Sequence, residues 1–126
     1  MEKVRSYEDL LVWQKAVDLS TEIFLITKTF PQEELYGLSS QMRRCAFSAP
    51  SNIAEGSERG SDNEFSRFIN IALGSLAELK TQLIIAERVL IISQEKSGNL
   101  KIKVDEISKM LKSLRNKIKP KLATSC

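Results

Sequence analysis

Residues 61–90, SDNEFSRFINIALGSLAELKTQLIIAERVL, carry the strongest structural signal in this chain. The stretch opens with the Ser61-x-x-Glu64 pattern, in which both side chains accept hydrogen bonds from backbone N–H groups at a helix start. Gly74 lowers helix propensity by about 1 kcal/mol, which is tolerable where another backbone approaches closely. The apolar residues recur at steps of four and three, the period of a packed helix seam: Phe65, Ile69, Ala72, Leu76, Leu79, Leu83, Ala86 and Leu90. The spacing predicts a helix over residues 62–94.

The same helical period recurs along most of the chain and predicts three further helices. Their expected ranges are 7–29, 32–58 with a kink near Pro50, and 101–119, and a turn is expected at Gly98-Asn99. No stretch shows the period-two alternation of a strand. We therefore expect an all-α fold, an up-down-up-down four-helix bundle that forms a single domain over residues 1–126.

The first and third expected helices carry more apolar surface than one bundle core can bury. In the first, a second apolar stripe lies beside the core stripe and contains Leu10, Trp13, Val17, Phe24 and Thr27. Apolar surface left over after core packing marks subunit interfaces, so we expect a homo-oligomer. Trp13 and Phe24 are the candidate interface residues, because large aromatic side chains contribute most at subunit contacts. The alternative is a broad helix face that is fully internal.

Residues 48–56, SAPSNIAEG, interrupt the second expected helix with a proline and closely spaced polar side chains. Proline lacks an N–H and crowds the carbonyl four residues earlier, so Pro50 predicts a kink that frees the carbonyl of Ala46 for Asn52 or a water. A polar stripe runs beside the apolar one and contains Ser48, Asn52 and Glu55. Two interpretations stay open: a structural hydrogen-bond network at the kink, or a binding site.

Positive charge is concentrated near the end of the chain. Residues 101–121 contain eight basic and two acidic residues, a balance of +6, whereas the rest of the chain has a balance of −3. This distribution favours binding of RNA or DNA phosphates, with weak sequence selectivity because lysine predominates and no aromatic residues are interleaved. The candidate residues are Lys109, Lys112, Arg115 and Lys117, with Arg43 and Arg44 as a second basic site. The alternative is a solvated, lysine-rich helix.

Several function classes are disfavoured by composition. The chain has no histidine, which removes the usual general base and most zinc and di-iron bundle sites. We therefore expect a protein that is not an enzyme, with no catalytic residues, metal or cofactor. Cys45 and Cys126 lack metal-ligand spacing, no apolar signal core follows the first residues, and the apolar runs are short for a membrane span. We expect a reduced, cytoplasmic protein with no membrane contact.

Five blocks carry a resemblance to a known family: YEDLLVWQKA (7–16), FPQEELYGL (30–38), QMRR (41–44), SAPSNIAEG (48–56) and IALGSLAEL (71–79). In these blocks the chain resembles the S23, or ribosomal-RNA intervening-sequence, family of bacterial four-helix-bundle proteins. The similarity runs from residue 7 to about residue 93, and the last helix matches only in character. Ala49 stands where the family usually has a larger aliphatic residue.

The resemblance implies a ring-like homopentamer whose relatives are encoded within insertions in large-subunit ribosomal RNA genes. The family has no established biochemical activity, so the resemblance leaves the function open. Our main hypothesis is a non-catalytic homo-oligomer that binds RNA or DNA through basic surfaces. The alternative is an oligomeric protein–protein scaffold that does not bind nucleic acid.

Overall fold

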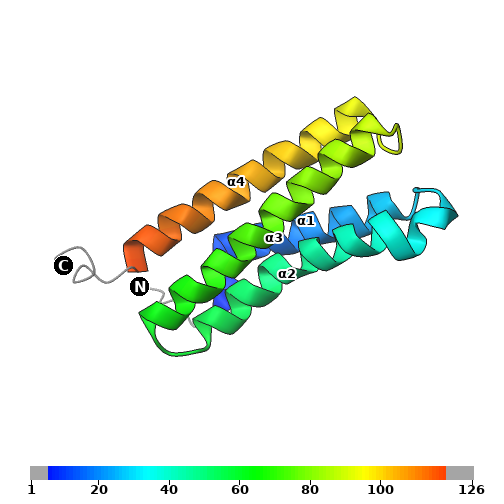
Figure 1. Cartoon of the computed structure of the whole chain (residues 1–126). Coiled ribbons are helices and arrows are strands. Elements are labelled where there is room, and N and C mark those ends of the chain that lie inside the picture. The colour runs from blue at the N-terminus through cyan, green and yellow to red at the C-terminus, as the bar shows by residue number, and fades with distance from the viewer. Residues whose placement is uncertain (1–5, 119–126) are drawn as a thin grey trace.

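The computed structural model describes residues 6–118 and consists of four α-helices joined by short connections (Figure 1). The helices are α1 (Leu11–Thr27), α2 (Ser40–Ser57), α3 (Asp62–Arg88) and α4 (Gln94–Ile118). Three short helical turns, η1 (Tyr7–Asp9), η2 (Gln32–Glu34) and η3 (Leu35–Ser39), precede α1 and α2. No strand occurs among the described residues, so the all-α prediction is confirmed.

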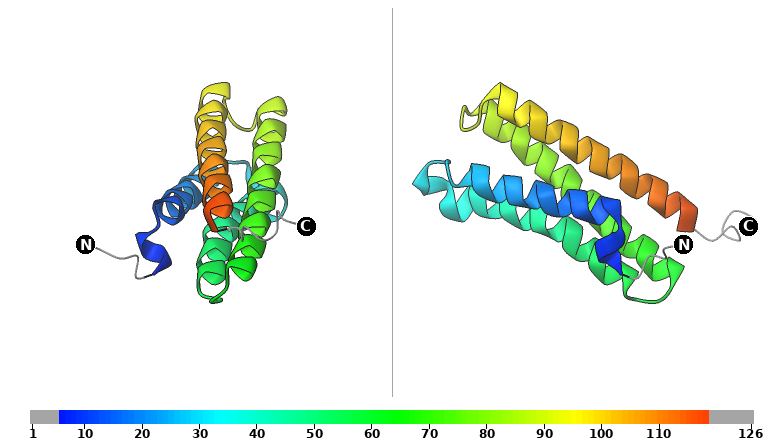
Figure 2. Two further views of the ribbon diagram at one scale, coloured as in Figure 1. Left: turned by 90° about the vertical axis from the view of Figure 1, so that its left-hand side faces the viewer. Right: turned by 180° about the vertical axis from the view of Figure 1, so that it is seen from behind.

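The helices form two neighbouring pairs, α1 with α2 and α3 with α4. Packing is most extensive between α2 and α3, and α1 also contacts α4. Figure 2 shows that the two pairs diverge toward the end that carries the α1–α2 and α3–α4 connections. The start of α1 and the end of α4 lie toward the opposite end (Figure 1). The contact between α2 and α3 is therefore the main interface between the two helix pairs.

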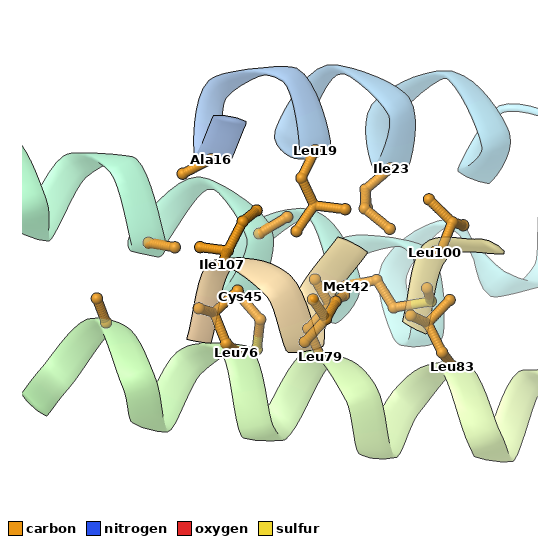
Figure 3. Packing of buried hydrophobic residues seen from close by; sticks show 14 of the residues in the cluster. Ala16, Leu19, Ile23, Met42, Cys45, Leu76, Leu79, Leu83, Leu100 and Ile107 are labelled. Atoms are coloured by element: carbon orange, nitrogen blue, oxygen red, sulfur yellow. The ribbon is translucent and has the colours of Figure 1, made fainter. Parts of the chain in front are cut away.

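The core is built around the apolar seam of α3. Figure 3 shows Leu76, Leu79 and Leu83 facing side chains of the other helices, including Leu19 of α1 and Met42 of α2. The predicted seam residues of α3 that are fully buried are Ile69, Ala72, Leu76, Leu79, Leu83 and Ala86. Burying a leucine or isoleucine side chain typically stabilises the folded state by about 1.5–3 kcal/mol relative to leaving it exposed.

The turn between α3 and α4 lies earlier in the chain than the sequence predicts. The expected turn at Gly98-Asn99 is wrong, because both residues lie inside α4. The helix start is capped by Ser93, whose Oγ accepts a hydrogen bond from the N–H of Lys96 at 3.1 Å. Leu90, which the seam pattern includes in the third helix, lies beyond its end with φ of 65° and is 88% exposed. A serine cap and the core contacts of α4 outweigh the small cost of one helical glycine.

The second helix also differs from the prediction at its start. Residues 32–39 form separate helical turns, and Gly37 has non-helical φ and ψ of −111° and −105°. From Ser40 to Ser57, α2 then continues through Pro50 without interruption. Non-helical backbone in this region therefore lies at Gly37, before α2 begins.

Ser20 of α1 supplies the hydrogen bond that Pro50 cannot make. Its Oγ lies 2.8 Å from the carbonyl oxygen of Ala46 and 2.9 Å from that of Ala16, and the hydroxyl is buried. The expectation that Asn52 or a water would bind the Ala46 carbonyl is therefore wrong. A donor from the neighbouring helix occupies this position and ties α1 to α2.

By length and composition α3 could cross a membrane, with a mean hydropathy of 1.3 in its most apolar window. This differs from the expectation that no apolar segment is long enough to span a membrane. The same property is typical of a core helix in a bundle, and the seam of α3 fills such a core. Packing explains part of this hydropathy, because 33% of the window is buried inside the fold.

Candidate nucleic-acid interface

The C-terminal half of α4 presents Lys109, Lys112 and Lys117 to solvent. We call these three residues the basic face. Within residues 6–118, no carboxylate forms an ion pair with any of them. Their ammonium groups are therefore available to an anionic partner, as the sequence predicts for an interface with phosphates.

The carboxylates that could neutralise the basic face from within α4 bind other helices. Helical spacing brings Asp105 and Glu106 to the same side as Lys109. Instead, Lys80 of α3 donates to Asp105 at 2.8 Å, and the Lys15 Nζ of α1 lies 3.3 Å from Glu106. The tertiary fold thus removes these two carboxylates from competition for the lysines.

The N-terminal half of α4, residues 94–106, has three lysines and three carboxylates, and two of its lysines are paired in the structure. Lys103 donates to Glu22 of α1 at 2.7 Å, and Lys101 lies 3.2 Å from Glu87 of α3. Hydrogen bonds with Ser97 and with Lys101 lower the pKa of the Glu87 carboxyl below its ordinary value. The two halves of α4 therefore differ: in the first, Lys101 and Lys103 are paired and Lys96 is not, whereas in the second none of the three lysines forms an ion pair with a described residue.

Arg115 lies beside the basic face and is half-buried against α3. One terminal nitrogen of its guanidinium donates to Asn70 Oδ1 at 2.7 Å. An amide therefore orients the side chain without neutralising it, and its charge adds to that of the lysines. Arg115 therefore adds positive charge near the basic face, although its side chain is only partly accessible to a partner.

The second predicted basic site, Arg43 and Arg44, lies at the other end of the molecule, near the start of α2 (Figure 1). Arg43 is half-buried, its Nε donates to Thr27 Oγ1 at 2.7 Å, and its guanidinium lies 4.5 Å from the centre of the Phe24 ring. Arg44 is exposed and donates to Gln41 Oε1 at 2.6 Å. Arg43 therefore serves the α1–α2 contact, and the structure does not bring this pair to the basic face.

The polar stripe of α2 divides into two parts. Asn52 Nδ2 donates to Ser48 Oγ at 2.9 Å and to the Ser48 carbonyl at 2.8 Å, and Ser75 of α3 donates to Ser48 Oγ at 2.8 Å. Glu55 points elsewhere and forms an exposed ion pair with Arg59 at 2.8 Å. Ser48 and Asn52 thus form an interhelical hydrogen-bond cluster with Ser75, a partner on α3 that the sequence pattern does not identify.

Cys45 is a buried core residue with a protonated thiol. Its thiol is buried, and desolvation raises its pKa above the ordinary value, so the sulfur stays protonated at neutral pH. Gln82 Nε2 donates to the sulfur at 3.6 Å. Among the described residues, no three side chains of the metal-binding types lie close enough to hold an ion.

The two predicted interface aromatics have different surroundings. Trp13 is half-buried, packs against the core of its own chain and contacts the ring of Tyr7 edge-on at 5.2 Å. Phe24 is 37% exposed and stacks on Phe47 of α2 at 6.4 Å. An open groove of about 380 Å³ between α1 and α2 includes both phenylalanines and Leu25. The sequence pattern misses Phe47 and Leu25, because they lie outside the stripes used to find the helices.

The comparisons with known proteins agree with the fold. No curated protein matches this chain. A crystal structure of a protein of unknown function from the S23 ribosomal protein family of Bacteroides thetaiotaomicron is similar, with a TM-score of 0.79 and 25% sequence identity, over 83% of this chain and 98% of that chain. The family model for the 23S rRNA-intervening sequence protein matches residues 8–113. This chain therefore belongs to the 23S rRNA-intervening sequence protein family.

Proposed function

We propose that this protein is a non-catalytic homo-oligomer, a ring-like pentamer of up-down-up-down bundles, that binds RNA or DNA through the basic face of α4. The observation that carries the proposal is the set of three exposed lysines, Lys109, Lys112 and Lys117, without a carboxylate partner in the described chain. Other lysines of the same helix, Lys101 and Lys103, are paired. Lys96 at the start of α4 is also exposed and forms no ion pair with a described residue, so three of the four unpaired lysines of this helix lie in its C-terminal half.

The chemistry of the basic face suits phosphates rather than bases. Lysine ammonium groups are compact point charges that bind phosphate oxygens without a fixed geometry. Helix α4 contains no aromatic residue that could stack on a base. Binding should therefore depend strongly on salt and weakly on sequence. A pentamer would repeat the face in each subunit and raise the avidity for a long polyanion.

The family relationship supports an RNA context, because the family is described by its relation to an intervening sequence in 23S rRNA. The similar Bacteroides protein is itself described as one of unknown function. The proposal for this chain therefore rests on the charge arrangement, and the family directs the choice of probe toward ribosomal RNA fragments alongside duplex DNA.

The proposal is tested by fluorescence anisotropy with labelled RNA and DNA at low salt. The test variant replaces Lys109, Lys112 and Lys117 with glutamine, and we expect its affinity to fall by at least tenfold. The matched control replaces the same number of charges with glutamine at paired positions whose partners lie outside α4, Arg59, Lys101 and Lys103. We expect the affinity of this control to stay within about threefold of the wild-type affinity.

The control separates location from net charge, since both variants lower it equally. Each variant is checked for an unchanged oligomer mass before binding is measured. Equal loss of affinity in the two variants would show that only total charge matters and would reject the basic face. Absence of binding by the wild type at low salt would reject nucleic-acid binding altogether.

A second candidate function is an oligomeric scaffold that binds another protein. The observation that favours it is the open groove between α1 and α2, where Phe24, Leu25 and Phe47 expose apolar surface. Exposed aromatic patches of this kind mark protein contacts. This candidate becomes the better interpretation if the wild type forms an oligomer but binds neither RNA nor DNA.

A further inference from the structure

Two surfaces of the molecule leave apolar side chains exposed. The first, which we call the α3 ridge, lies on the exposed side of α3 and consists of Ile71, Gly74, Glu78, Ile85 and Val89. The second, the α1–α2 groove, is walled by Val17, Thr21, Phe24, Leu25 and Phe47 above a floor of Ser20 and Pro50. One surface is a long convex helix, and the other is an elongated apolar depression.

The α3 ridge shows the features of a helix surface that packs against another chain. Ile71, Ile85 and Val89 are 41%, 47% and 56% exposed, and helical spacing places them on one side of α3. Gly74 lies between them, although a Cβ at this position would meet no atom within 4 Å. Packing within the chain therefore does not require glycine here, whereas close approach of another backbone would.

Cations border the α1–α2 groove at Phe24, whereas the ridge carries one acid, Glu78, and ends beside the exposed Arg88. Phe24 lies under two cations, with Lys28 Nζ 5.3 Å and the Arg43 guanidinium 4.5 Å from the ring centre. The ridge carries the exposed carboxylate of Glu78, which interacts with the Cys45 thiol of α2 but forms no ion pair with any described residue. Apolar surface with a central acid thus faces a groove bordered by cations, which is the pattern of complementary interfaces.

We propose that the α3 ridge of one copy of this chain packs into the α1–α2 groove of a second copy. The inference rests on the proposed homo-oligomer and adds the two surfaces that form it. Since the ridge and the groove are different parts of the molecule, the contact is heterologous, and its repetition generates a ring or an open filament. Ile85 and Leu25 contribute apolar area, and Glu78 approaches the cations at Phe24.

Four single variants test this contact by light scattering. Leu25→Glu disrupts the groove, and Leu11→Glu is its control, because Leu11 is 57% exposed at the start of α1 and Leu25 is 56% exposed. Ile85→Lys disrupts the ridge, and Ile102→Lys on α4 is its control. We expect both test variants to fall to the 14.2 kDa mass of one chain and both controls to keep the wild-type mass.

Mixing the two test variants identifies the contact as heterologous. The Leu25→Glu chain keeps its ridge and the Ile85→Lys chain keeps its groove, so an equimolar mixture retains one intact contact. We expect the mixture to form dimers and nothing larger. Failure of the mixture to associate, or wild-type mass in either test variant, would overturn the inference while leaving a homo-oligomer intact. A monomeric wild type would instead refute the proposed oligomer itself.

Crosslinking provides a readout that does not depend on disrupting assembly. In a background with Cys126 replaced by serine, chains with Leu25→Cys and Ile85→Cys are mixed and mildly oxidised. We expect a disulfide-linked heterodimer, and none from the control pair Leu11→Cys and Ile102→Cys. Equal crosslinking in the test and control pairs would contradict the proposed juxtaposition, as would its absence from the test pair in an assembled sample.

Discussion

Replacing Ser20 with alanine should destabilise the protein because it leaves a buried carbonyl without a donor. The Ser20 hydroxyl lies 2.8 Å from the Ala46 oxygen, whose usual helical partner would be the N–H of residue 50. Pro50 has no N–H, so Ser20 provides the donor from another helix. An unsatisfied buried carbonyl costs about 1–3 kcal/mol, and we expect Ser20→Ala to lower the free energy of unfolding by this amount.

The second arm of the experiment restores the missing donor within α2. Pro50→Ala supplies an N–H at the position from which a helix normally donates to the Ala46 carbonyl. In that background the Ser20 hydroxyl becomes redundant, so Ser20→Ala should cost less than about 0.5 kcal/mol beyond its lost packing. The two substitutions should therefore show a coupling free energy of about 1–2 kcal/mol.

The assay is chemical denaturation of the wild type, the two single variants and the double variant. All four are compared at one protein concentration, because assembly would make apparent stability depend on concentration. Thr21→Ala is the matched control, since Thr21 is exposed and its hydroxyl bonds only to the Val17 carbonyl of its own helix. We expect this control to change stability by less than about 0.5 kcal/mol.

Additive effects of Ser20→Ala and Pro50→Ala would refute the reasoning, since additivity would mean that the hydroxyl and the missing N–H do not serve the same carbonyl. Unchanged stability of Ser20→Ala would refute it more simply. A change shared equally by Ser20→Ala and Thr21→Ala would assign the effect to helix propensity instead of the interhelical bond.

Three further predictions concern other positions. Gly56→Ala should destabilise the fold by about 1–3 kcal/mol in denaturation, because the new Cβ would lie 2.6 Å from the Cβ of Phe68; a stabilised variant would contradict this close contact. Asn52→Leu should cost about 1–3 kcal/mol through its lost bonds to Ser48, whereas Glu55→Leu should change stability by less than about 1 kcal/mol, because its ion pair is exposed; equal losses would show that the polar stripe acts as one unit. The lowered pKa of Glu87 means that its stabilising effect is complete above the ordinary value of 4.5 and is lost as pH falls through the lowered value. The stability difference between wild type and Glu87→Gln should therefore shrink in acid, and a difference that is constant between neutral and acidic pH would contradict the pairing.

The sequence predicts those parts of the fold that depend on local periodicity. The α3 seam is correct from Ile69 to Ala86 because each residue falls on one face of a single helix. The start of α4 is missed because Gly98-Asn99 is a stronger turn signal in the sequence than the single serine, Ser93, that caps the helix. Capping and the packing of α4 decide this boundary, and only the cap is visible locally.

The candidate site could be predicted in composition but not in accessibility. The sequence identifies a basic last helix, yet lysines at positions 101 and 103 look the same as those at 109 and 112. The difference arises from Glu22 and Glu87, which lie on other helices and bind the first pair. Likewise, the partner of the Ala46 carbonyl is Ser20, which is distant in sequence and becomes a neighbour only when α1 packs on α2. Such contacts require the tertiary fold.

The dependence of binding on salt tests the proposed function of the basic face. For duplex DNA, the slope of log affinity against log salt is about −0.9 for each phosphate neutralised, so engagement of Lys109, Lys112 and Lys117 in one subunit should give a slope of about −2.7, and engagement of several subunits a steeper one. The measurement is a titration of the wild-type oligomer with labelled duplex at several salt concentrations. We expect tight binding at low salt with a slope at least this steep. A slope near zero, or no binding at the lowest salt concentration, would contradict phosphate recognition by α4.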